Sequence, residues 1–154
     1  MNETIIYVLK GIFLIIFANE GSEVTEVVSL MVHLNRMHID FQCFAPNENQ
    51  TQVVNHLTGE TSTETRNVLV ESARIARGEV KDIAELKGED YQAVILPGGF
   101  GVAKNLSDYA VNGGSFNVHE QVTRVLKVQI ISLESIAKEF TKLKANKYFF
   151  LGVP

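Results

Sequence analysis

Residues 91–101 read YQAVILPGGFG and join a short apolar run to an abrupt glycine-rich turn. A continuous apolar run of this length is typical of a central strand of a parallel sheet, buried on both faces. Glycine accepts positive φ and lets backbone N–H groups face a ligand without a Cβ in the way. Successive N–H groups ahead of a helix can hold an anion or an oxyanion. The segment predicts a strand-to-helix turn with Gly98 and Gly99 as candidate amide donors; the alternative is a tight turn and nothing more.

Strands and helices alternate on both sides of this segment. We expect strands at 12–17, 39–45 and 91–96, and helices at about 24–34, 61–77, 82–88, 102–109 and 118–127. Alternation of this kind implies right-handed crossovers and a three-layer, doubly wound α/β sheet that is mainly parallel. Ligands of such sheets bind where the carboxyl ends of strands meet loops. The two candidate loops are residues 19–26 and 97–101.

Two of the expected helices have recognisable starts. Ser22 is a candidate N-cap for the first, whose apolar stripe lies at helical spacing; the stripe consists of Val24, Val27, Val28, Met31 and Leu34. Thr61 with Glu64 resembles a capping box for a helix that ends at Arg77, where Gly78 closes it.

Composition narrows the class of protein. The 154 residues fit a single domain, and a net charge of −4 with a pI near 5.6 gives no electrostatic footprint for nucleic acid. The single cysteine rules out an internal disulfide and fits a reducing compartment. Lys10 and Gly11 divide the apolar amino end into strand-sized pieces, and no signal or transit peptide is evident. We therefore expect an intracellular chain without a membrane segment.

The residues that could carry chemistry are few. Glu26 lies in the first turn of a helix, where an acid often only balances the helix dipole, but it could relay a proton if it points toward Gly98 and Gly99. Cys43 lies mid-strand without a basic neighbour and is predicted to be a buried structural thiol. No histidine has a second ligand at metal spacing, so we assign no metal, and Lys104 stands where a dinucleotide fingerprint needs its third glycine, so we assign no cofactor.

Several longer motifs occur in a fixed order. They are Gly21-Ser22-Glu23 with Glu26, Phe44-Ala45-Pro46, NHLTGE at 55–60, TRNVL at 65–69, ESARIARG at 71–78 and PGGFGVAKNLS at 97–107. Together they resemble the ElbB glyoxalase family and its animal mitochondrial counterparts, within the glutamine-amidotransferase-like, PfpI-type superfamily. The resemblance covers residues 20–127 of a single domain that we take as 1–154, and residues 128–154 form a divergent tail.

The resemblance implies a flavodoxin-like fold, a homodimer and a small carbonyl or anionic ligand. It also implies a site made of a helix-start glutamate, two glycine amides and a cysteine on a strand-to-helix elbow. Glu26 matches the glutamate, as proton relay, and Gly98 and Gly99 match the oxyanion amides. Family chemistry would be addition of the thiolate to glyoxal or methylglyoxal. Members from animals imply a mitochondrial location, and the alternative is cytoplasmic.

The resemblance fails at the expected nucleophile. The elbow would fall near Gly152 or Val153, and neither can attack a carbonyl. We therefore expect a truncated homologue, with a sheet incomplete on its C-terminal side, that is catalytically inactive. Two alternatives stay open: a module that binds a small anion or a nucleotide through residues 98–101, and an interaction protein that dimerises through uncovered apolar surface.

Overall fold

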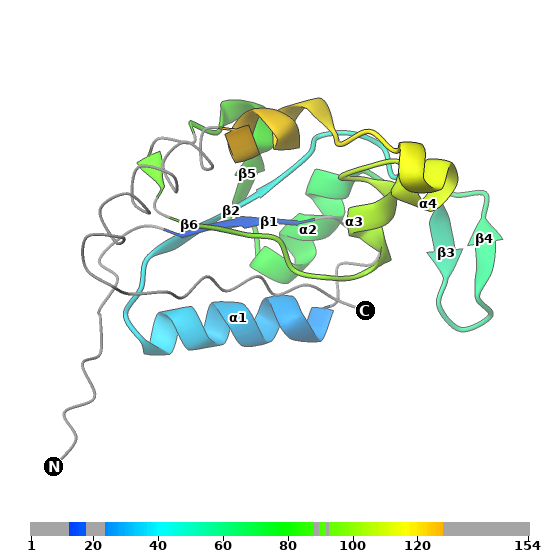
Figure 1. Ribbon diagram of the computed structural model, residues 1–154. Coiled ribbons are helices and arrows are strands. Elements are labelled where there is room, and N and C mark those ends of the chain that lie inside the picture. The colour runs from blue at the N-terminus through cyan, green and yellow to red at the C-terminus, as the bar shows by residue number, and fades with distance from the viewer. Residues whose placement is uncertain (1–12, 18–23, 88–89, 92, 128–154) are drawn as a thin grey trace, which may run out of the picture.

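A computed structural model describes residues 13–17, 24–87, 90–91 and 93–127 (Figure 1). Its elements, in chain order, are β1 Phe13–Ile16, α1 Val24–Arg36, β2 Phe41–Ala45, β3 Val53–Asn55, β4 Glu60–Ser62, α2 Val68–Ala76, β5 Val80–Asp82, the 3₁₀ turn η1 Ile83–Glu85, β6 Ala93–Ile95, α3 Phe100–Lys104, α4 Tyr109–Asn112 and the 3₁₀ turn η3 Gly113–Ser115. Residues 120–127 are also helical. Ser22, Gly88 and the tail from 128 on lie outside the described residues, so the expected elbow and the expectation of an incomplete sheet are not tested.

The main sheet is parallel and winds in two directions from β1. Its strand order is β5-β2-β1-β6, and each neighbouring pair is parallel. The chain runs from β1 to β2 and β5 on one side and then crosses to β6 on the other. This reversal is the doubly wound arrangement predicted from the alternation of elements. Strands β3 and β4 form a separate antiparallel hairpin.

Both faces of the sheet are covered, because successive strand residues point to opposite faces. Ile15 and Cys43 point into a cluster with side chains of α1 and α2. Ile16 and Phe44 point into a second cluster with η1 and the helix at 120–127. Figure 1 shows α1 below the sheet and the 120–127 helix above it. The three layers expected from the sequence are therefore present.

Strand β6 differs from the central strand that its apolar run predicts. Within the described residues it ends the sheet order and pairs with β1 alone. Its apolar side chains are nonetheless packed, since Val94 lies against one cluster and Ile95 against the other. Because both faces of β6 pack against a hydrophobic cluster, successive residues of this strand are all apolar.

Helix α1 buries a narrower stripe than predicted. Val27 and Leu34 are buried, but Val24 is 53% exposed and Val28 is 44% exposed. Residues of a helix are rotated 100° from one another, so the positions at 27 and 34 share a side, while those at 24 and 28 lie toward its edge. The predicted apolar stripe is therefore present, but its Val24 and Val28 positions lie at the surface.

The start predicted for the second helix is also wrong. Thr61 lies in β4, paired with Val54 of β3, so it cannot cap a helix. Helix α2 begins at Val68, and its N-cap is Asn67, whose Oδ1 accepts the N–H of Val70 at 3.0 Å. The predicted end is confirmed: Gly78 has φ +89 and donates its N–H to the carbonyl of Ala73 at 2.9 Å.

Two later elements also differ from the sequence expectation. The helix predicted at 102–109 is divided into α3 and α4, and Ser107 between them donates its hydroxyl to the carbonyl of Val102 at 2.9 Å. Strand β5 was not predicted, because three residues are too short for a periodic signal. The short helical turn after Asp82 is confirmed as η1, with the Asp82 carboxylate accepting the N–H of Ala84 at 2.9 Å.

Arg124 joins the 120–127 helix to the segment around η1, a contact that no sequence pattern predicts. Its guanidinium donates to the carbonyls of Leu86 at 2.7 Å and Ile83 at 3.0 Å. These carbonyls belong to η1 and the residue after it. A charged donor thus ties the 120–127 helix to the short turn below it.

Candidate functional site

The candidate site lies where the sheet changes direction. Strands β1 and β6 are parallel neighbours, with Ile15 paired to Ile95. Their carboxyl ends therefore meet at one edge, and the segments that follow them run into helices α1 and α3. In open α/β sheets, this reversal point is where ligands bind.

Glu26 and Gly98 are in direct contact at this edge. The N–H of Gly98 donates to Oε2 of Glu26 at 2.7 Å, although the two residues are 72 positions apart in sequence. Glu26 comes from the first turn of α1 and Gly98 from the turn after β6. The structure thus brings together two of the three residues selected from the sequence. Their roles as proton relay and oxyanion donor stay predictions.

Gly99 shapes the turn that presents this amide. It is the N-cap of α3, with φ +108 and ψ 162, in a region of backbone space that is essentially restricted to glycine. No side chain caps α3 at this end. Gly98 is buried and Gly99 is half-buried. The path of the turn therefore depends on glycine at position 99.

Cys43 lies inside the sheet, not in the loops at this edge, and its thiol is expected to be unreactive. It lies in the middle of β2, is 1% exposed, and packs in the cluster between the sheet and helices α1 and α2. Burial raises the pKa of its thiol from 9.0 to about 12, so the nucleophilic thiolate is scarce at neutral pH. The prediction that Cys43 is a buried structural thiol is confirmed.

We expect Cys43 to be unreactive in the native protein and reactive once the chain unfolds. A thiol-specific reagent such as Ellman's reagent should detect no thiol at pH 8 and one thiol in denaturant. Because the folded pKa lies above the ordinary value, stability is unaffected below pH 9 and falls as pH rises toward 12. Rapid native labelling at pH 8 would contradict this account.

Histidine and acidic side chains do not form a metal centre in the described part of the chain. No group of three or more His, Cys, Asp or Glu side chains that could hold a metal is found there. His119 is engaged structurally: Nδ1 accepts the N–H of Gln121 at 3.2 Å, and Nε2 lies 3.1 Å from Oε1 of Glu48. None of the described helices is long and apolar enough to cross a membrane.

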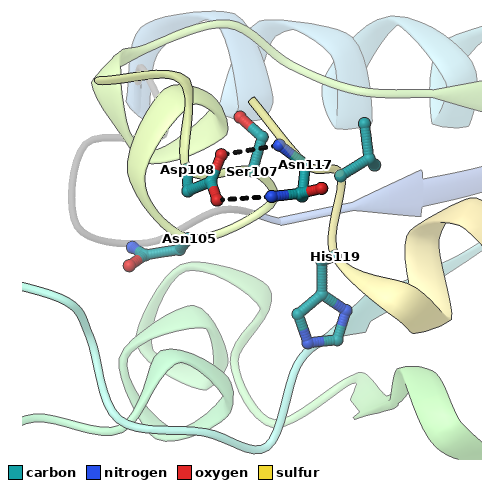
Figure 2. Close-up of a pocket in the computed structure, with 6 residues that line it drawn as sticks. Asn105, Ser107, Asp108, Asn117 and His119 are labelled. Atoms are coloured by element: carbon teal, nitrogen blue, oxygen red, sulfur yellow. Dashed lines mark hydrogen bonds between the residues drawn. The ribbon is translucent and has the colours of Figure 1, made fainter. Parts of the chain in front are cut away.

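A small hollow lies beyond the carboxyl end of α3 (Figure 2). Its volume is about 220 Å³, and its lining consists of Asn105, Ser107, Asp108, Asn117, Val118 and His119. The carboxylate of Asp108 accepts the backbone N–H of Asn117 at 2.6 Å and its side-chain amide at 3.1 Å. These bonds lower the pKa of Asp108 and close the loop that carries α4 and η3. Glu26 and Gly98 do not line this hollow. Its lining comes from two separate segments, 105–108 and 117–119, which together form no recognisable motif in the sequence.

Comparison with known proteins identifies relatives of this chain. The human "glutamine amidotransferase-like class 1 domain-containing protein 3, mitochondrial" is 49% identical over 109 residues, and the rat "ES1 protein homolog, mitochondrial" is 48% identical over the same length. The zebrafish ES1 protein, also named mitochondrial, is 36% identical over 113 residues. Over the matched region the chain is similar to the ES1-type, glutamine amidotransferase-like proteins. Each match covers 70% of this chain, which spans about two fifths of the length of these relatives (41%, 41% and 42%).

A solved structure agrees with this relationship. The isoprenoid biosynthesis protein with an amidotransferase-like domain from Ehrlichia chaffeensis is 40% identical, with a TM-score of 0.69 over 75% of this chain and 57% of its own. The flavodoxin-like fold predicted from the sequence is thereby confirmed, as is the predicted resemblance to amidotransferase-like proteins. No family model matches the sequence.

Proposed function

We propose that this ES1-type chain holds the binding half of a glyoxalase-like site and binds small carbonyl compounds without converting them. The observation that carries the proposal is the 2.7 Å hydrogen bond between the N–H of Gly98 and the carboxylate of Glu26. It joins a strong donor and a strong acceptor at the edge where ligands of doubly wound sheets bind.

These two groups complement a hydrated aldehyde. The hydroxyl of the ligand donates to the Glu26 carboxylate, and one of its oxygens accepts the N–H of Gly98 or Gly99. Glu26 is exposed, so its carboxylate can release the Gly98 amide when a ligand arrives. Hydrogen bonds to an ionised group are about twice as strong as neutral ones, so Glu26 contributes most of the affinity.

The absence of turnover follows from the position of Cys43. Addition of a thiolate to an aldehyde needs a deprotonated sulfur within reach of the carbonyl carbon. Cys43 is the only cysteine of the sequence. It is buried, has a pKa of about 12 and faces the layer of α1 and α2. The chain therefore holds the carbonyl but offers no thiolate that could add to it.

We also propose a mitochondrial location for this chain. The support is that the human, rat and zebrafish relatives are each named mitochondrial.

Titration with methylglyoxal tests the proposed function. Spectra of ¹⁵N-labelled protein, recorded directly after mixing, should show concentration-dependent shifts of the Gly98 and Gly99 amides. Glu26→Gln keeps the shape of the side chain but loses its charge, so the Kd should rise roughly tenfold. Glu60→Gln, an exposed change in β4, is the matched control and should leave the Kd unchanged.

Two outcomes would overturn the proposal. Binding is refuted if the wild-type amides of Gly98 and Gly99 do not shift while the spectrum stays that of a folded protein. The absence of covalent chemistry is refuted if purified protein converts methylglyoxal to lactate, and still does so after Cys43→Ala.

A further inference from the structure

Helix α3, which follows the Gly98–Gly99 turn, is too short to hold its own direction. It has five residues, whereas isolated helices need about 12 to 15 residues to be even marginally stable in water. Contacts with other elements must therefore set its orientation. Because the turn continues directly into α3, the same contacts set where the Gly98 and Gly99 amides point.

The carboxyl end of α3 is held by Thr51, which is more than fifty positions earlier in the chain. The hydroxyl of Thr51 donates to the carbonyl of Lys104 at 2.7 Å. The N–H of Thr51 donates to Oδ1 of Asn105 at 3.0 Å. The last carbonyls of a helix have no partner within the helix, so Thr51 supplies from outside a cap that α3 does not supply itself.

A neighbouring pair strengthens this connection. The ammonium of Lys104 donates to Oε1 of Gln52 at 2.8 Å. It also lies 5.7 Å from the centre of the Phe100 ring, which belongs to the first turn of α3. Residues 51 and 52 thus hold the carboxyl end of this short helix, and the Lys104 side chain connects that end to Phe100 in the first turn.

The segment that carries Thr51 is itself fixed. Residues 46–52 connect β2 to β3 and begin at the carboxyl end of β2, the edge of the sheet that also carries the candidate site. The carbonyl of Glu48 accepts the N–H of Val68 at 2.8 Å, and the N–H of Gln50 donates to the carbonyl of Arg66 at 2.7 Å. These bonds tie the segment to the start of α2. Through Thr51, the position of α3 is therefore set relative to α2, a longer helix of nine residues.

We propose that Thr51 is a positioning residue for the Gly98 and Gly99 amides, and that it sets the affinity of the site without touching the ligand. The inference rests on the proposed function for its effect on binding. Its effect on the orientation of the turn can be measured without any ligand.

Thr51→Val tests the proposal, because it removes the hydroxyl and keeps the shape and the backbone N–H. In the ligand-free protein the amide resonances of Gly98 and Gly99 should move. The Kd for methylglyoxal should rise roughly 3- to 10-fold, as expected for loss of one hydrogen bond. Thr51→Ser restores the hydroxyl and should restore both readouts. Thr58→Val removes a hydroxyl that accepts the N–H of Glu60 in the turn of the hairpin; it is the control and should change neither readout.

The outcomes separate this inference from the proposed function. Unchanged Gly98 and Gly99 resonances in ligand-free Thr51→Val would overturn the positioning role. Shifted resonances in a protein whose wild type does not bind methylglyoxal would overturn the proposed function alone. Should Thr51→Val fail to fold, Asn105→Ala, which removes the Oδ1 that accepts the Thr51 N–H, replaces it with the same expected shifts; unchanged Gly98 and Gly99 resonances would again refute the role.

Discussion

Replacing Gly99 with valine is expected to abolish methylglyoxal binding and to lower the free energy of unfolding by about 3 kcal/mol. The backbone at Gly99, with φ +108 and ψ 162, is one that a β-branched residue cannot adopt without strain. The turn can relieve that strain only by changing its path, which moves the Gly98 amide away from Glu26. Urea denaturation gives the stability, and amide shifts during titration give the binding.

Gly114→Ala is the matched control for this change. Gly114 lies in η3, and a Cβ added there meets nothing within 4 Å. We expect stability within about 0.5 kcal/mol of the wild type and unchanged binding. A Gly99→Val protein that still bound methylglyoxal at wild-type affinity would show that the turn does not depend on its glycine.

Ile15→Ala is expected to be the most destabilising single truncation in the sheet, at about 4 kcal/mol. Ile15 is fully buried in β1, between Cys43 of β2 and Ile95 of β6. Its removal leaves a cavity in the cluster that also holds Val27 of α1. Close packing on every side prevents the surroundings from filling the space. Equilibrium unfolding in urea, with the midpoint and slope fitted together, measures the loss.

Val32→Ala in α1 is the comparison for Ile15→Ala. Val32 is 41% exposed, and alanine has the higher helix propensity, so the change should cost less than about 0.5 kcal/mol. Equal losses for the two variants would mean that the cluster around Ile15 is not the core of the fold.

The contact between Glu26 and Gly98 could be anticipated from the sequence, because topology alone produces it. Two apolar strands separated by helical crossovers become parallel neighbours, and the residues that follow them meet at one edge. Glu26 lies in the helix that follows one such strand, and Gly98 lies in the turn that follows the other. An inference of this kind needs only the order of elements, and neither side chains nor exact boundaries.

Thr51 could not be anticipated in this way. Its role depends on a hydroxyl reaching the end of a five-residue helix from a distant loop, and no periodicity encodes such a contact. The hairpin of β3 and β4 was missed for a related reason. Its strands are three residues long and its second strand is polar, Glu60–Ser62, so local signals there favoured a helix start at Thr61. The pairing of Thr61 with Val54 overrode that signal.

The central place of β1 in the sheet has a consequence for how the chain assembles. Phe13 pairs with Phe41 on one side and with Ala93 on the other. The first pairing closes a short loop around α1, whereas the second must wait until the chain has been synthesised beyond β6. Closing the longer loop costs more entropy, and such non-local pairings slow folding. The candidate site straddles this last pairing, so it is completed late in folding, and β1 presents an open edge to chaperones until then.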